Sequence, residues 1–275
     1  MSRPVNIVSL RQKIRNIEND QAREAQRENV MALVVVAQML PQGVVKGGSA
    51  MAVRYGSGAR ATKDLDAARQ QDEDHFLDEL EDKLEAGWQG FTGRVKQVKK
   101  PSPAGVPPQY VMTPFDIKLQ YEGKDWKTVR FEVAHNELHV ADSVDRQISD
   151  ELSSLFMDLG FDAPDPVPVV KPEHQIAQKI HAATFPDSQR AHDLVDLQIL
   201  VANEDIDYSK AKELCEQTFK YRGDHSWPPE FVRGEGWDDV YRAAVENMTL
   251  PGVEILGLED AIRWSNDLVK RIDFS

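Results

Sequence analysis

The sequence has a single cysteine, no long apolar run and no excess of positive charge. Cys215 cannot form a disulfide within the chain, so nothing in the sequence favours an oxidising compartment. The longest apolar run, residues 30–40, is about half the roughly 20 residues that a membrane-spanning helix needs. It also begins too far from the first residue to be the apolar segment of a secretory signal. We therefore expect a cytoplasmic protein that does not enter a membrane.

The charge is strongly acidic overall but unevenly distributed. The chain carries 33 basic and 46 acidic residues, a net charge of −13, which argues against non-specific binding of nucleic acid or membranes by the whole surface. Residues 1–60 nevertheless hold nine basic and four acidic residues, and residues 94–130 hold eight basic and three acidic ones. These two segments predict a face to which a polyanion could bind, and a solvated basic face without a ligand is the alternative.

The 275 residues are 41% hydrophobic and 29% charged, which is typical of a globular protein of about two domains. Helical periodicity covers residues 8–40 and 72–88. Alternating strand patterns cover residues 94–98, 110–121 and 126–134. The last two strands predict a hairpin that turns at Gly123. A proline-rich stretch at residues 162–172 indicates a domain boundary, and helical patterns follow it. The predicted fold is α+β, with a mixed sheet and flanking helices in residues 1–165 and a helical domain in residues 166–275.

Asp64 and Asp66 form an Asp-x-Asp pair in the segment KDLD. If this segment is a strand, residues two apart point to the same side, and both carboxylates share one face. Two carboxylates this close repel each other, and a divalent cation relieves the repulsion. Mg²⁺ prefers one or two carboxylates completed by phosphate and water oxygens. The pair therefore indicates a metal–nucleotide site, although Asp-x-Asp also occurs by chance in acidic proteins.

Gly47-Gly48-Ser49 precedes this pair and is a candidate phosphate site. Two glycines permit positive φ, so that successive backbone N–H groups can converge on an anion. The Ser49 hydroxyl and the N-terminus of a following helix would add donors. The segment is not a P-loop, because Lys46 precedes the glycines. A plain turn between two elements is the alternative.

A third carboxylate is expected, because two-metal phosphoryl chemistry uses one to bind the second ion or to activate the attacking oxygen. Glu132, in the strand pattern VRFEVA, is the preferred candidate, and Asp116, in PFDIK, is the alternative. Exposed acids are common on strands, so no motif decides between the two.

A second group of charged residues follows the proline-rich boundary. Asp193 and Asp196 are three residues apart in a helical pattern and therefore lie on one face. Lys179 lies on the preceding helical segment, from which its ammonium group could neutralise a triphosphate as a point charge. The alternative is a structural salt bridge between Lys179 and Asp193 that joins two packed helices.

Taken in order, these segments resemble the nucleotidyltransferase AbiEii/AbiGii toxin family, which includes the MenT-type toxins. The resemblance covers most of residues 10–200 and is carried by Lys46–Ala50 with Arg54, Arg60–Asp66 (RATKDLD), Lys179–Ala182 (KIHA) and Arg190–Leu197 (RAHDLVDL). It implies a minimal nucleotidyltransferase core, with a twisted mixed sheet flanked by helices, followed by a helical domain. It also implies the toxin of a toxin–antitoxin or abortive-infection pair, whose antitoxin is often a winged-helix protein encoded beside it.

The resemblance also implies roles for individual residues. These roles are nucleotide binding by Lys46, Gly48, Ser49, Thr62, Arg190 and Asp196, binding of Mg²⁺ or Mn²⁺ by Asp64 and Asp66, and catalysis by Asp64, Asp66, Lys179 and Asp193. Glu132 is the expected third metal ligand, but no family motif fixes it. The gap between Ser49 and Asp64 is longer than is usual in the family, which predicts an extended loop at residues 55–63. Some members are thought to modify the 3′ end of tRNA, which makes tRNA a candidate acceptor.

The expected reaction is attack of an acceptor hydroxyl on the α-phosphorus of a nucleoside triphosphate, with pyrophosphate leaving. One alternative is a transferase that modifies a small molecule such as an aminoglycoside, or a protein side chain. The net charge of −13 mildly favours such a cationic substrate. The other alternative is a catalytically silent nucleotide-binding module that acts through a partner, and the intact acidic motifs argue against it.

Overall fold

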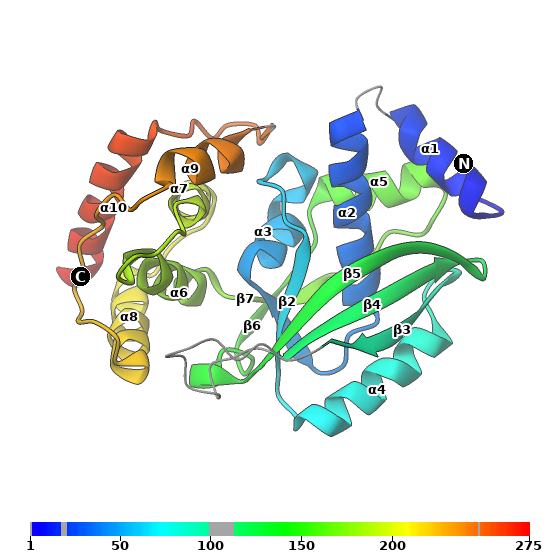
Figure 1. The fold of residues 1–275 in the computed structure, drawn as a ribbon, viewed down its shortest axis with the longest axis horizontal. Helices are drawn as coiled ribbons and strands as arrows, with labels where there is room; N and C mark the ends of the chain where they lie inside the picture. Colours follow the sequence, from blue (N-terminus) through cyan, green and yellow to red (C-terminus); the bar gives the residue numbers. More distant parts are fainter. Residues whose placement is uncertain (1, 18–20, 99–112, 247) are drawn as a thin grey trace. The chain divides into compact units, whose positions relative to one another are not determined.

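The structure, a computed structural model, describes residues 2–17, 21–98, 113–246 and 248–275 (Figure 1). The chain divides into two compact units, Met1–Val170 and Lys171–Ser275, which are called unit 1 and unit 2 below. The division lies five residues after the expected boundary, because residues 167–170 form a strand of the unit 1 sheet. Within the described ranges, no helix has both the length and the apolar character needed to cross a membrane.

Unit 1 is built on a seven-stranded sheet with the order β3-β4-β5-β2-β1-β7-β6. The strands are β1 (Gly43–Lys46), β2 (Asp64–Arg69), β3 (Phe91–Gln97), β4 (Thr113–Tyr121), β5 (Lys124–His135), β6 (Val144–Gln147) and β7 (Val167–Val170). The pairs β2–β5 and β1–β7 are parallel and the other neighbours are antiparallel, so the sheet is mixed. The predicted α+β fold is confirmed.

The three predicted strands correspond to β3, β4 and β5, and β4 and β5 form the expected hairpin. Gly123 at its turn has φ +72°, a conformation that glycine adopts without strain. The first residues of the predicted second strand, 110–112, and the proline-rich loop before it lie outside the described residues. The sequence pattern does not predict β1, β6 or β7, each of which has only four residues.

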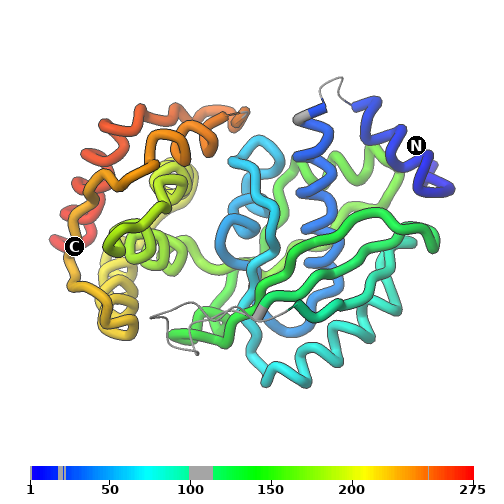
Figure 2. The backbone as a smooth tube through the Cα atoms, in the orientation of Figure 1, coloured from blue at the N-terminus to red at the C-terminus, as the bar shows by residue number. Residues whose placement is uncertain are grey.

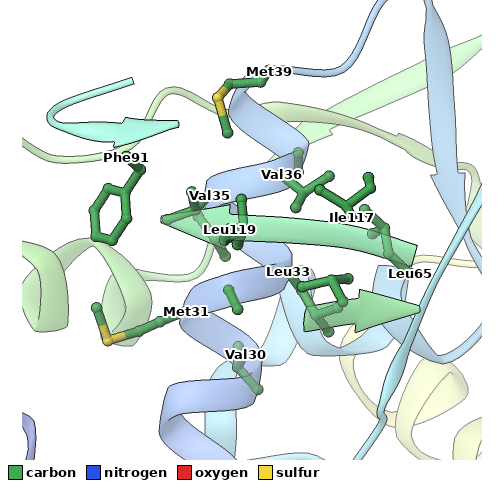
Figure 3. Packing of buried hydrophobic residues seen from close by; sticks show 14 of the residues in the cluster. Val30, Met31, Leu33, Val35, Val36, Met39, Leu65, Phe91, Ile117 and Leu119 are labelled. Carbon is green, nitrogen blue, oxygen red and sulfur yellow. The ribbon is translucent and has the colours of Figure 1, made fainter. Parts of the chain in front are cut away.

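The helices of unit 1 are α1 (Ile7–Ile17), α2 (Gln21–Gln38), α3 (Gly47–Tyr55), α4 (Glu73–Ala86) and α5 (Asp150–Leu159). The predicted helices are confirmed as α1, α2 and α4, whereas the pattern does not predict α5. The apolar run of α2 is buried all round, because α2 contacts α1, α3 and β5. Figure 3 shows Val35 and Val36 of α2 beside Leu119 and Ile117 of β4.

Strands β4 and β5 turn one face to this core and the other face outwards. Phe115, Ile117 and Leu119 of β4 belong to the core, and so do Val129, Phe131 and Val133 of β5. The residues between them are polar and at least partly exposed. We call the outward side the polar face, and with its neighbours on β3 it comprises Arg94, Lys96, Asp116, Lys118, Arg130 and Glu132.

Unit 2 consists of helices in its described part. They are α6 (Pro172–Thr184), α7 (His192–Asn203), α8 (Tyr208–Arg222), α9 (Trp237–Val245) and α10 (Leu258–Asp273). α6 packs against α7 and α8, while α7 also contacts α9 and α10. The predicted helical character of this half is confirmed.

Two histidines lie together in unit 2, where His181 is buried and His225 is partly exposed. The ring of His181 on α6 is 4.8 Å from the rings of both His225 and Phe219. Among the described residues, His181 Nε2 and His225 Nδ1 have no hydrogen-bond partner. Burial lowers the pKa of His181 to about 4, with the neighbouring His225 and Arg222 adding to the effect and Asp224 opposing it. The fold therefore keeps this ring neutral.

We expect acid to destabilise unit 2 through His181. The pKa in the fold, about 4, lies below the ordinary value of 6.5. The stability that depends on a neutral His181 is therefore fully present above pH 6.5. It is lost as the pH falls from 6.5 towards 4. His181→Phe should reduce the loss of unfolding free energy between pH 7 and pH 4.5 by roughly 2 kcal/mol. Urea unfolding of the full chain at each pH measures this loss.

The matched control is His75→Gln, since His75 is exposed on α4 and takes no part in the His181 contacts. This control should lose as much unfolding free energy in acid as the original protein. An unchanged acid sensitivity in His181→Phe would show that other groups govern the stability of unit 2 below pH 6.5.

Candidate active site

The Asp-x-Asp pair begins strand β2, as the sequence predicts. Asp64 is exposed and Asp66 is half-buried, and the intervening Leu65 is fully buried in the core. In the sheet register, Asp66 lies beside Lys46 of β1 on one side and beside Glu132 of β5 on the other. Three of the predicted site residues therefore form one row across neighbouring strands, with Asp64 on the same face.

The register also separates the two candidates for the third carboxylate. Glu132 is the direct neighbour of Asp66, whereas Arg130 lies between Asp64 and Asp116. The Arg130 guanidinium is 3.7 Å from both Asp116 and Glu132. The pairing therefore brings Glu132, rather than Asp116, next to the Asp-x-Asp pair.

The glycine turn lies against the same pair of aspartates. Gly47 begins α3 with φ +61°, which confirms that the turn uses the conformational freedom of glycine. A Cβ atom on Gly47 would lie 2.1 Å from Asp66 Oδ2, so the carboxylate packs directly on the glycine backbone. Any side chain at this position would displace the Asp66 carboxylate.

Ser49 is fully buried, and its hydroxyl connects three elements. Its Oγ donates to the carbonyl oxygen of Lys46 at 2.8 Å and accepts from the backbone N–H of Asp66 at 3.0 Å. The hydroxyl thus joins the end of β1 and the first turn of α3 to β2. Its predicted contact with a phosphate stays a prediction, and the function visible in the structure is to position Asp66.

The expected extended loop between α3 and β2 can be followed in Figure 2, and side chains of α2 and α5 hold it by hydrogen bonds. Gln26 of α2 donates to the carbonyl oxygens of Ser57 and Ala59 at 2.7 and 3.1 Å. Glu151 of α5 accepts from the backbone N–H of Ser57 at 2.7 Å and from its hydroxyl. We call residues 56–63 the anchored loop.

The anchored loop brings two side chains onto Gly48. A Cβ atom on Gly48 would lie 2.9 Å from Arg60 Nη2 and 3.0 Å from Thr62 Oγ1. Thr62 is one of the predicted nucleotide-binding residues, whereas the sequence predicts no role for Arg60. Arg60, Thr62, Asp64 and Asp66 occupy every second position, and this spacing is a sequence signal that includes Arg60. Only the fold shows that Arg60 lies against the glycine turn.

The donor set suits a hard divalent cation completed by its substrate. Asp64 and Asp66 offer carboxylate oxygens on one face, and Mg²⁺ binds in proteins with one or two carboxylates plus phosphate and water oxygens. In the described part of the chain, no group of three or more His, Cys, Asp or Glu side chains is arranged to hold a metal by itself.

In unit 2, the second predicted group forms a buried cluster between α6 and α7. Lys179 Nζ lies 3.1 Å from Asp193 Oδ1 and 2.6 Å from Asp196 Oδ2. Arg190 Nε donates to Asp193 Oδ2 at 2.6 Å. Lys179 is 4% exposed and both aspartates are fully buried. The salt bridge that the sequence offered as the alternative is therefore present, with Asp196 as an additional partner.

The charges of this cluster balance, with two cations and two carboxylates. Burial raises the pKa of Asp193, but the charges of Lys179, Arg190 and His192 outweigh burial and hold that pKa well below its usual range. Asp193 is thus ionised in the folded protein. Roles of Lys179 at a phosphate and of Asp193 in catalysis stay predictions.

A mixed sheet with an Asp-x-Asp pair beside a glycine turn is compatible with the binding of a metal-complexed nucleotide. The family model described as nucleotidyl transferase AbiEii toxin, type IV TA system, matches residues 32–263. The chain belongs to this family of nucleotidyltransferase toxins, which confirms the resemblance of the motifs.

A solved structure supports the fold. The structure is similar to that of MenT4, the nucleotidyltransferase toxin Rv2826c from Mycobacterium tuberculosis H37Rv, with a TM-score of 0.51 and 16% sequence identity. The match covers 96% of this chain and 98% of that chain. A comparison with curated protein sequences gives no match.

Removal of the Lys179 ammonium should destabilise unit 2, because it leaves buried carboxylates without their shared cation. We expect Lys179→Met to lower the unfolding free energy by about 3–5 kcal/mol. Adding Asp196→Asn restores the charge balance and should recover at least half of the loss. Urea unfolding followed by circular dichroism measures both variants.

The control for this prediction is Lys270→Met, since Lys270 and its partner Asp267 are about two-thirds exposed. An exposed pair contributes little, so this variant should unfold like the original protein. Equal stability of Lys179→Met and Lys270→Met would show that the buried cluster does not hold α6 and α7 together.

Proposed function

We propose that the chain transfers a nucleoside monophosphate from a nucleoside triphosphate to a hydroxyl of RNA, with the 3′ end of tRNA as acceptor and Mg²⁺ or Mn²⁺ as cofactor. The observation that carries the proposal is the row of Lys46, Asp66 and Glu132 across β1, β2 and β5, with Asp64 on the same face. Carboxylates at this spacing, beside the N-terminus of α3, suit a metal-complexed triphosphate.

In the proposed reaction the acceptor hydroxyl attacks the α-phosphorus in line with the leaving pyrophosphate, so that one P–O bond forms while the bond to the β-phosphate breaks. Asp64 and Asp66 would hold the cation, which neutralises phosphate charge when bound. The backbone of Gly47 and Gly48 orients the triphosphate at the start of α3. Glu132 acts as the third carboxylate and accepts the proton of the attacking hydroxyl.

For unit 2 the proposal keeps the roles that the family resemblance implies. Lys179 contacts a phosphate, Asp193 is the essential acid, and Arg190 and Asp196 support it. Because Lys179 bonds both aspartates, its ammonium would reach a phosphate only by giving up one of these bonds. Such an exchange leaves one buried carboxylate without its bond to Lys179, so the bond to the phosphate has to offset that cost.

The polar face supports RNA as the acceptor. In the register, Arg94 pairs with Lys118, while Lys96, Asp116, Arg130 and Asp64 form the next row across β3, β4, β5 and β2. Basic side chains therefore share the face that carries the Asp-x-Asp pair. A nucleic-acid backbone bound there would lie along the row that ends at Asp64, in spite of the acidic charge of the whole chain.

As the toxin of a type IV system, the protein has an antitoxin partner. We propose that this partner is a winged-helix protein encoded beside it, on the family resemblance alone. The nucleotide and RNA substrates are cytoplasmic, and the single cysteine is buried and reduced, so we assign the activity to the cytoplasm.

Incubation of the protein with each α-labelled nucleoside triphosphate, Mg²⁺ and total cellular RNA tests the reaction. We expect label in RNA, concentrated in tRNA. Asp64→Asn or Asp66→Asn should lower incorporation by at least about 100-fold, because the triphosphate loses its metal anchor. The control Asp82→Asn removes an exposed carboxylate from α4 and should retain full incorporation.

The other outcomes of this experiment point to other functions. Label on a small molecule or on protein would replace RNA as the acceptor and favour a cationic substrate. Incorporation that survives in Asp64→Asn and Asp66→Asn would remove the pair from the reaction. Absence of label everywhere would favour a silent nucleotide-binding module.

Binding of tRNA should weaken with salt, because each neutralised phosphate releases a counterion. We expect the combined variant Arg94→Gln, Lys96→Gln and Lys118→Gln to reduce the slope of log affinity against log salt by about 2, at roughly 0.7 per lost contact with a single strand. A matched control removes three cations of unit 2, Lys210, Lys220 and Lys270. Equal slopes in the two variants would exclude the polar face as the RNA-binding surface.

A further inference from the structure

The triphosphate of a nucleotide carries several negative charges, and its binding needs cations close to the glycine turn as well as the metal. Of the cations predicted from the sequence, Lys46 directly precedes the turn, whereas Lys179 and Arg190 bind buried carboxylates in unit 2. Unit 1 contains a different cation at the turn itself. The Arg60 side chain reaches Gly48 from the anchored loop, and a Cβ atom on Gly48 would lie 2.9 Å from Arg60 Nη2.

The fold fixes the backbone on both sides of Arg60, so the position of this residue does not depend on its flexible side chain alone. Its backbone follows directly after Ala59, whose carbonyl oxygen accepts a hydrogen bond from Gln26 at 3.1 Å. Two residues later, Thr62 also contacts Gly48, and β2 begins at Asp64. The backbone of Arg60 is therefore fixed between two anchored segments, and its guanidinium lies against Gly48 in the first turn of α3.

We propose that Arg60 binds the β- and γ-phosphates of the nucleoside triphosphate and makes the site selective for a triphosphate over a monophosphate. This inference rests on the proposed function. A guanidinium presents two parallel N–H donors to a phosphate, and such charge-assisted hydrogen bonds are about twice as strong as neutral ones. The absence of a side chain at Gly48 lets this guanidinium lie against the first turn of α3.

The test measures binding of non-hydrolysable α,β-methylene nucleoside triphosphates and of nucleoside monophosphates by calorimetry with Mg²⁺ and the full chain. Arg60→Gln should weaken triphosphate binding about 10- to 100-fold and change monophosphate binding less than about twofold. Arg60→Lys keeps the charge but loses the paired donors, so its triphosphate affinity should be intermediate.

A second variant tests the same geometry from the other side. Gly48→Ala introduces a Cβ atom that displaces the guanidinium, and it should reproduce the selective loss of triphosphate affinity. The control Arg146→Gln removes an exposed cation from β6 and should bind both ligands like the original protein. Melting temperatures identify any variant that fails to fold. If Gly48→Ala fails to fold, Arg60→Gln and Arg60→Lys alone test the proposal.

The outcomes separate this inference from the function on which it rests. If the original protein binds no nucleoside triphosphate, the proposed function fails. If the original protein binds and Arg60→Gln binds equally well, only the role of Arg60 is overturned. An equal loss of triphosphate and monophosphate affinity in Arg60→Gln would also overturn it, because Arg60 would then only shape the loop.

Discussion

The hydroxyl of Ser49 holds the start of α3 against strand β2, and the proposed chemistry of unit 1 depends on this junction. It bonds the carbonyl oxygen of Lys46 and the backbone N–H of Asp66 while fully buried. Gly47 lets the Asp66 carboxylate lie directly on the turn. The turn and the carboxylate pair therefore form one rigid feature, so a change in one is transmitted to the other.

The sequence predicts the long elements of this protein well, because their patterns are local. The amphipathic helix α4 and the alternating strands β4 and β5 can be recognised from their own residues. Strands β1, β6 and β7 have four residues each and are defined by their neighbours in the sheet. β7 contains Pro168 and lies in a proline-rich stretch, which explains why that stretch resembles a linker.

The candidate site was predictable in its residue types but not in its geometry. Asp64 and Asp66 follow from strand periodicity, whereas the choice of Glu132 over Asp116 depends on a parallel pairing of segments about 66 residues apart. In unit 2, helical spacing predicts that Asp193 and Asp196 share a face. That both would bond Lys179 depends on how α6 packs against α7. Arg60 illustrates the same limit, since its contact with Gly48 arises from the path of a loop.

The anchoring of residues 56–63 by Gln26 and Glu151 has an energetic consequence for the ligand. A loop that must be ordered by its ligand costs conformational entropy, and this cost is subtracted from the observed affinity. Here hydrogen bonds from α2 and α5 order the loop as part of the fold, which lowers the cost that a ligand has to offset. Preorganisation of this kind leaves more of the interaction energy of the phosphates available for the transition state.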